Sequence, residues 1–144
     1  MDYTSQNLVF RLKKIFRYTC LYGLPRTLAK VRGQYHKKYN YKSLPKVDLL
    51  KPNSRAHIGL IGCGNYAFSN IAYYLDRYRP GLIRGVMDTD INRSASFCQR
   101  YTATYYISEF LEILADDGIN LVYIASNHTS HFALCFGPSP CLII

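Results

Sequence analysis

The sequence has no tryptophan, no C-x-x-C pair and no long apolar run. Its cysteines are odd in number, at Cys20, Cys63, Cys98, Cys135 and Cys141. This arrangement argues against a disulfide framework or a zinc site and favours a reducing cytosol. No apolar run approaches the ~18 residues of a membrane-spanning helix, and basic residues interrupt any signal-peptide core near the N-terminus. We therefore expect a cytoplasmic protein of about one domain, without a bound metal.

Acidic residues are scarce in the first part of the chain. Residues 1–56 hold 13 Lys and Arg but only 2 Asp and Glu, a net charge of +11, whereas residues 57–144 carry −2. The basic character therefore belongs to an N-terminal extension and not to the part that follows. Apolar residues at helical spacing predict a basic amphipathic helix over about residues 5–20. A second helix is expected from Pro25 through Val31, with Gly33 near its end.

The role of this extension stays open between several interpretations. The simplest is a solvated helical arm that packs on its own subunit or on a neighbouring one, because charge runs usually form solvated faces. We rank below it an anionic membrane surface and nucleic acid, both of which suit basic charge interleaved with aromatic residues. We expect His36 to lie on the surface, since no second ligand residue stands beside it at metal-binding spacing.

The chain is organised around a glycine-rich turn that follows an apolar, β-branched run. Gly62-Cys63-Gly64-Asn65-Tyr66-Ala67 fits G-x-G-x-x-A and precedes a helical pattern over residues 69–78. In this motif the first glycine makes a tight turn, the second lets a diphosphate approach the backbone, and the alanine lets the helix pack closely on the sheet. An acid, Asp88, follows the next strand at the distance where a carboxylate meets an adenosine ribose. The alternative is an ordinary strand-to-helix turn, with Asp88 capping a loop.

Strand and helix patterns alternate from residue 57 to residue 125. Strands are expected at residues 57–61, 82–87, 104–107 and 121–125, with helices at 91–101 and 109–115 between the later ones. In the last helix, Phe110, Leu111 and Leu114 are expected to face inward. This alternation predicts an α/β fold, an incomplete Rossmann-type parallel sheet of about four strands with helices on both faces.

A polar loop, SNHTSH, follows the fourth strand at residues 126–131. In a doubly wound sheet the crevice lies where strand order reverses, so this loop should border the same site as Gly64. It could contact the nicotinamide side of a dinucleotide, or its Asn, Thr and Ser residues could simply cap the next helix.

These segments resemble the glucose–fructose oxidoreductase/inositol dehydrogenase/MocA family. The resemblance is carried by HIGLIGCGNYAFSNIAYYL, IRGVMDTDINRSASFCQRY and YYISEFLEILADDGINLVYIASNHTSH. It implies NAD(P)-dependent hydride transfer at a carbon of a sugar, cyclitol or sugar nucleotide. It also implies that Gly62, Cys63, Gly64, Asn65 and Tyr66 line the pyrophosphate and that Asp88 holds the ribose. Ala125, Ser126, Asn127 and His131 would border the nicotinamide.

The resemblance stops after residue 133. The family's Glu-Lys-Pro motif, whose lysine is catalytic, does not follow, and Pro138 and Pro140 oppose a helix or a central strand. We therefore divide the chain into a basic helical extension and linker (1–56), a partial dinucleotide-binding domain (57–133) and an apolar tail outside the family pattern (134–144). We expect a truncated product whose sheet ends at the fourth strand with an exposed edge, inviting self-association.

The function expected from the sequence is that of the NAD(P)-binding portion of an oxidoreductase, inactive alone and without catalytic residues of its own. NAD is preferred because Asp88 would repel a 2′-phosphate, although Arg93 nearby leaves NADP open. The alternative is a non-enzymatic binding module whose basic arm contacts an anionic membrane, nucleic acid or a partner subunit.

Overall fold

A parallel β-sheet forms the centre of the computed structural model, which describes residues 5–46, 55–126 and 142–143. The strands are β1 (Ile58–Ile61), β2 (Ile83–Met87), β3 (Tyr105–Ile107), β4 (Leu121–Ile124) and β5 (Leu142–Ile143). Their order is β3-β2-β1-β4-β5, so the chain runs outward from β1 to β3 and then crosses to the other side of β1. The predicted Rossmann-type parallel sheet is confirmed.

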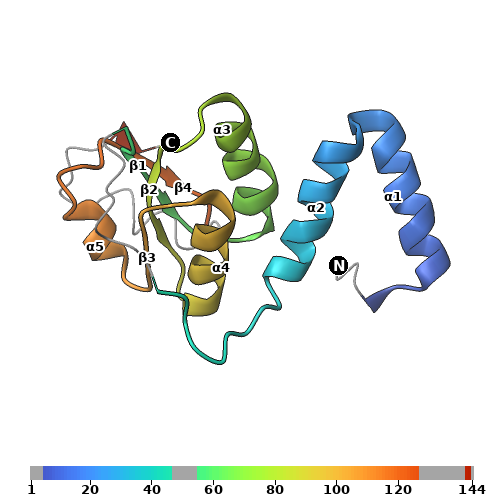
Figure 1. Cartoon of the computed structure of the whole chain (residues 1–144), viewed down its shortest axis with the longest axis horizontal. Helices are drawn as coiled ribbons and strands as arrows, with labels where there is room; N and C mark the ends of the chain where they lie inside the picture. Colours follow the sequence, from blue (N-terminus) through green and yellow to red (C-terminus); the bar gives the residue numbers. More distant parts are fainter. Residues whose placement is uncertain (1–4, 47–54, 127–141, 144) are drawn as a thin grey trace.

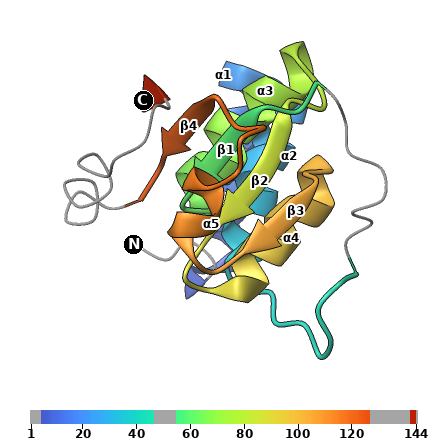
Figure 2. The same ribbon diagram turned by 90° about the vertical axis from the view of Figure 1, so that its left-hand side faces the viewer.

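Helices cover both faces of the sheet (Figure 1). One face carries a π-helix, η2 (Ala67–Ile71), its continuation α3 (Ala72–Tyr78), and α4 (Ile91–Tyr101). The other face carries the short helix α5 (Phe110–Leu114). Figure 2 looks onto the sheet from the α5 side and shows β3, β2, β1 and β4 side by side.

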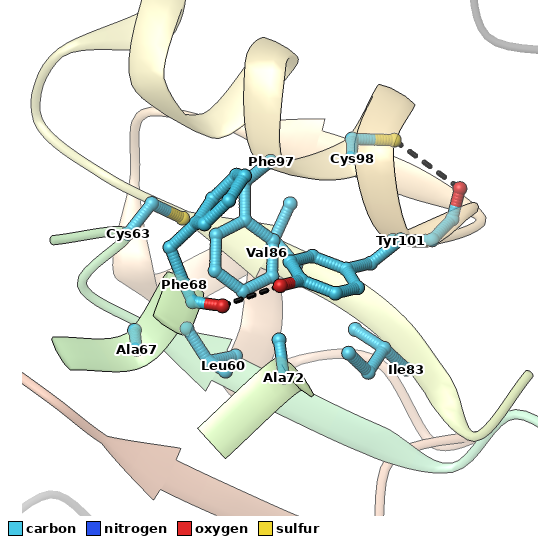
Figure 3. Packing of buried hydrophobic residues seen from close by; sticks show 11 residues of the cluster. Leu60, Cys63, Ala67, Phe68, Ala72, Ile83, Val86, Phe97, Cys98 and Tyr101 are labelled. Atoms are coloured by element: carbon cyan, nitrogen blue, oxygen red, sulfur yellow. Dashed lines mark hydrogen bonds between the residues drawn. The ribbon is translucent and has the colours of Figure 1, made fainter. Parts of the chain in front are cut away.

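The larger hydrophobic core lies under η2, α3 and α4 (Figure 3). Phe68 packs edge to face against Phe97 and Tyr101, and these rings lie in one cluster with the strand residues Leu60 and Val86. The Tyr101 hydroxyl donates a hydrogen bond to the Phe68 carbonyl, which lies within the π-helix. The phenol is therefore satisfied inside the core rather than left as an unpaired polar group.

The second core lies beneath α5, and its central residue differs from the prediction. Leu111 is 63% exposed, whereas Ile113 is fully buried. Ile113 points at two glycines of adjacent strands, where a Cβ on Gly59 would come within 2.8 Å of its side chain and one on Gly85 within 2.7 Å. The missing side chains make room for Ile113, which the helical pattern alone did not reveal.

The N-terminal extension forms a helical hairpin, α1 (Leu8–Tyr22) and α2 (Leu24–His36). Gly23 joins the two helices at φ +80°, a backbone conformation that glycine adopts without strain. Helix α2 packs on η2 and α4, whereas α1 packs on α2 and has no buried residue. The prediction that α2 ends near Val31 was wrong: Gly33 is a packing position inside the helix and not its end.

The expected bare edge at β4 is also corrected. Leu121 pairs with Leu142 and Val122 with Ile143 in parallel register, so β5 occupies that edge. Leu142 and Ile143 follow Pro138 and Pro140 in the sequence, so neither proline lies within the paired strand.

Candidate functional site

The first glycine of the turn lets two strand ends meet. Gly62 has φ +94°, and a Cβ there would lie 2.9 Å from the Ala125 carbonyl carbon and from the Ser126 nitrogen. Only glycine allows both the left-handed conformation and this close approach. Ala125 and Ser126, which directly follow β4, therefore lie against the turn, as expected at the point where strand order reverses.

The second glycine is open on its outer side. No heavy atom lies within 4 Å of the position that a Cβ on Gly64 would occupy. The Gly64 carbonyl accepts the first helical hydrogen bond of the next element, from Phe68 N at 3.0 Å. Because the first amides of a helix have no partner within the helix, an anion placed before Gly64 would meet N–H groups and the positive end of the dipole.

Asp88 faces this turn. Its Oδ2 accepts a hydrogen bond from Cys63 N at 2.8 Å, and its Oδ1 accepts one from Asp90 N at 3.0 Å. A carboxylate has about four lone-pair positions, so each oxygen can accept a further bond from a ribose hydroxyl. Arg93 stands beside it, with Nη1 4.0 Å from Asp88 and Nε 3.2 Å from Asp90.

His36, predicted to be a surface residue, is buried against the same turn. Its Nε2 lies 2.6 Å from the Cys63 carbonyl oxygen, and its Nδ1 lies 3.2 Å from Ser96 Oγ. The ring stacks on Phe68 with a centroid distance of 4.3 Å. Since a carbonyl can only accept, Nε2 carries the proton and Nδ1 accepts from the Ser96 hydroxyl. Burial lowers the pKa of His36, which keeps the ring neutral.

Both backbone groups of Cys63 are thus held by side chains, its N–H by Asp88 and its carbonyl by His36. The Cys63 thiol itself is fully buried, 3.5 Å from the Met87 carbonyl, and burial raises its pKa well above the usual value. Cys63 is therefore an unreactive packing residue whose backbone groups position the turn.

The close approach of α2 explains how His36 reaches the turn. The buried residues of α2 are Thr27, Ala29, Gly33 and His36, and the first three are small. A Cβ on Gly33 would lie 2.5 Å from Asn65 Oδ1. Small residues at about helical spacing just before His36 were the one sequence signal of this contact.

The other predicted site residues differ in position. Asn65 lies beside α2, where its Oδ1 is buried without a hydrogen-bond partner, and Tyr66 is 65% exposed. Asn127 and His131 lie outside the described residues. Within the part of the chain that the structure describes, no cluster of metal-ligating side chains occurs, and no helix is long and apolar enough to cross a membrane.

A sequence model described as "oxidoreductase family, NAD-binding Rossmann fold" matches residues 56–136. The chain belongs to this Gfo/Idh/MocA family. The turn, the open space before Gly64 and Asp88 thus lie in the NAD-binding Rossmann domain of the family, and these residues fit the diphosphate and ribose of such a cofactor.

Solved structures agree on the fold. One is KijD10, a 3-ketoreductase from Actinomadura kijaniata crystallised with NADP and TDP-benzene; it is 18% identical, with a TM-score of 0.52, over 62% of this chain and 28% of that one. Another is an oxidoreductase from Agrobacterium radiobacter crystallised with NAD+, L-tartaric acid and magnesium; it is 26% identical, with a TM-score of 0.50, over 56% of this chain and 23% of that one. The match therefore spans about a quarter of the length of these proteins. No curated protein matches the chain.

Proposed function

We propose that this chain is the dinucleotide-binding part of an oxidoreductase that acts on a CH–OH group of a sugar, cyclitol or sugar nucleotide. The observation that carries the proposal is the carboxylate of Asp88 on the Cys63 amide, beside the open side of Gly64. The turn from Gly62 to Tyr66 would line the diphosphate, with donor amides from Gly64 onward, because the amides of Gly62 and Cys63 already bond the Met87 carbonyl and Asp88. Asp88 would hold the adenosine ribose. KijD10 and the Agrobacterium oxidoreductase, crystallised with NADP and NAD+, support a nicotinamide dinucleotide as the cofactor.

NAD, when bound, accepts or supplies the hydride at C4 of its nicotinamide. The residues of this chain bind and orient it: Ala125 and Ser126, together with Asn127 and His131, would border the nicotinamide side. No Glu-Lys-Pro motif occurs in these 144 residues, so we expect the chain alone to bind cofactor without measurable turnover. We also propose a cytoplasmic location, because the odd number and wide spacing of the cysteines in the sequence favour a reducing compartment.

We propose a preference for NAD over NADP. The Asp88 carboxylate would repel a 2′-phosphate, while Arg93 next to it offsets part of that repulsion. The preference should therefore be moderate rather than absolute.

The test is calorimetric titration of the chain with NADH and with NADPH. Asp88→Ala should weaken NADH binding by about 10- to 100-fold, because charge-assisted hydrogen bonds contribute about 1.5–3 kcal/mol. The matched control is Asp116→Asn, since Asp116 bonds Arg84 and the Tyr105 hydroxyl next to the amino ends of the strands, away from the turn. Equal heats for wild type and Asp88→Ala would remove Asp88 from the ribose role.

A further inference from the structure

The apolar stripe of α1 faces away from the rest of the molecule. Leu8, Leu12 and Phe16 recur every four residues, with Val9 beside them, and their exposed fractions are 63, 57, 71 and 57%. An amphipathic helix of a globular protein ordinarily turns such a stripe toward its core. Here the stripe has no covering element among the described residues.

The face of α1 that meets α2 is mixed: Phe10 and Ile15 lie there beside the polar or charged Arg11, Lys14 and Tyr18. Arg11 donates a hydrogen bond to the Tyr35 hydroxyl of α2, and Lys14 and Tyr18 line a cavity of about 270 Å³ between the two helices. Only part of the apolar surface of α1 is therefore used against α2, and the leucines and Phe16 are turned outward. Helix α2 lies between α1 and the sheet, so the outer face of α1 is accessible to an extended surface such as a bilayer (Figure 1).

Charge decides what kind of surface this is. The described residues 5–46 include 11 Lys and Arg and no Asp or Glu. Lys13 and Arg17 stand four and eight residues after Val9, so they run along the edge of the stripe. A basic border beside exposed Leu and Phe is typical of helices that lie in the plane of an anionic bilayer. A second copy of the same arm would bring like charges together.

We propose that α1 docks on an anionic lipid surface, with Leu8, Leu12 and Phe16 entering the boundary between headgroups and acyl chains and Lys13 and Arg17 contacting the headgroups. Nucleic acid fits this face less well. Single strands bind on stacking aromatic side chains, and the stripe is mainly aliphatic, with Phe16 its one ring. The proposed cofactor site is on the other side of α2, so this surface is independent of it.

The test is co-sedimentation of the full chain with vesicles of phosphatidylcholine alone and of phosphatidylcholine with about 30% phosphatidylglycerol. The decisive variant is Leu12→Glu, and the matched control is Leu111→Glu, the same change at a leucine of similar exposure on α5. Wild type and Leu111→Glu should pellet with the anionic vesicles. The pelleted fraction of Leu12→Glu should be at least five-fold lower. Circular dichroism should be alike for all three, because both sites are exposed.

Four results would overturn the proposal. The first is absence of binding to anionic vesicles at low salt, or equal binding to neutral ones. The second is equal pelleting of Leu12→Glu and wild type. The third is sedimentation velocity showing a wild-type dimer that Leu12→Glu converts to monomer, which would assign the stripe to a second copy of the chain. The fourth is a single-stranded oligonucleotide that displaces the protein from vesicles and binds wild type and Leu12→Glu with equal affinity. This result would assign the basic residues to nucleic-acid binding instead.

Discussion

At the scale of single residues, His36 links the extension to the glycine turn. Its imidazole fixes the Cys63 carbonyl while Asp88 fixes the Cys63 amide, so the backbone that precedes Gly64 is held from both sides. A loop that must present its amides to a diphosphate gains affinity when it is already in the bound geometry. We therefore expect His36 to act as a positioning residue for the proposed cofactor site.

Two substitutions separate the packing of His36 from its hydrogen bonds. His36→Ala should lower the free energy of unfolding by about 2–4 kcal/mol, since it removes a buried ring stacked on Phe68. His36→Phe should cost less, about 1–3 kcal/mol, because it keeps a ring but leaves the Cys63 carbonyl unpaired. Urea denaturation gives both values. If the positioning role holds, both variants weaken NADH binding in calorimetry, whereas a purely structural role predicts weakening only in proportion to the stability lost.

The protonation of His36 makes stability depend on pH. Burial lowers its pKa in the folded chain, against a smaller opposing effect of the Cys63 carbonyl and Asp88, while in the unfolded chain it titrates near ~6.5. Below that pH the unfolded state binds a proton that folded His36 does not, so stability is complete above the unfolded pKa and declines as pH falls toward the folded one. Urea midpoints measured from pH 7.5 to 5.5 should fall in wild type and fall less in His36→Phe. If the urea midpoints of the two proteins change equally with pH, His36 is not the cause of the pH dependence.

At the scale of elements, local sequence patterns predicted the helices and strands whose ends are set by nearby residues. Helix α4 runs over Ile91–Tyr101 as predicted, because Asp90 caps it by accepting from Asn92 N at 3.1 Å. The same holds for the four strands that alternate with helices. Contacts between distant residues were not visible: the π-helix at η2 holds a carbonyl that is bonded to Tyr101, 33 residues away. The sequence pattern suggested that Gly33 ends a helix. A glycine is needed there because Asn65, which is distant in the sequence, packs close to it, and a local pattern cannot show this contact.

For the candidate site, the sequence predicted the turn and Asp88 but not His36. The glycines and the acid belong to one strand–helix–strand unit, so their spacing alone brings them together. His36 lies 27 residues before Cys63 and reaches it only because α2 packs across η2. A lone histidine in a basic stretch carries no local sign of burial, so the sequence predicts a surface position for His36.

At the scale of the whole molecule, the extension consists of two parts that make different contacts. Besides His36, its later residues are tied to the α/β domain through Tyr41, which bonds Asn92 and Gln99, and through the Pro45 carbonyl, which accepts from the Tyr106 hydroxyl. Helix α1 has no buried residue, and its packing contacts are with α2. The nucleotide fold thus includes α2 and the following segment, and α1 is an attachment to it.

Two deletions test this division. Removing residues 1–22 should change the free energy of unfolding by less than ~1 kcal/mol and leave NADH affinity intact, because exposed positions contribute little, yet it should abolish vesicle binding. Removing residues 1–46 should cost more than ~3 kcal/mol and weaken NADH binding, because it uncovers Phe68 and frees the Cys63 carbonyl. Urea denaturation, calorimetry and co-sedimentation of both proteins give the comparison. Loss of NADH binding on removal of α1 alone would show that the first helix also supports the nucleotide site, and the division at Gly23 would then be wrong.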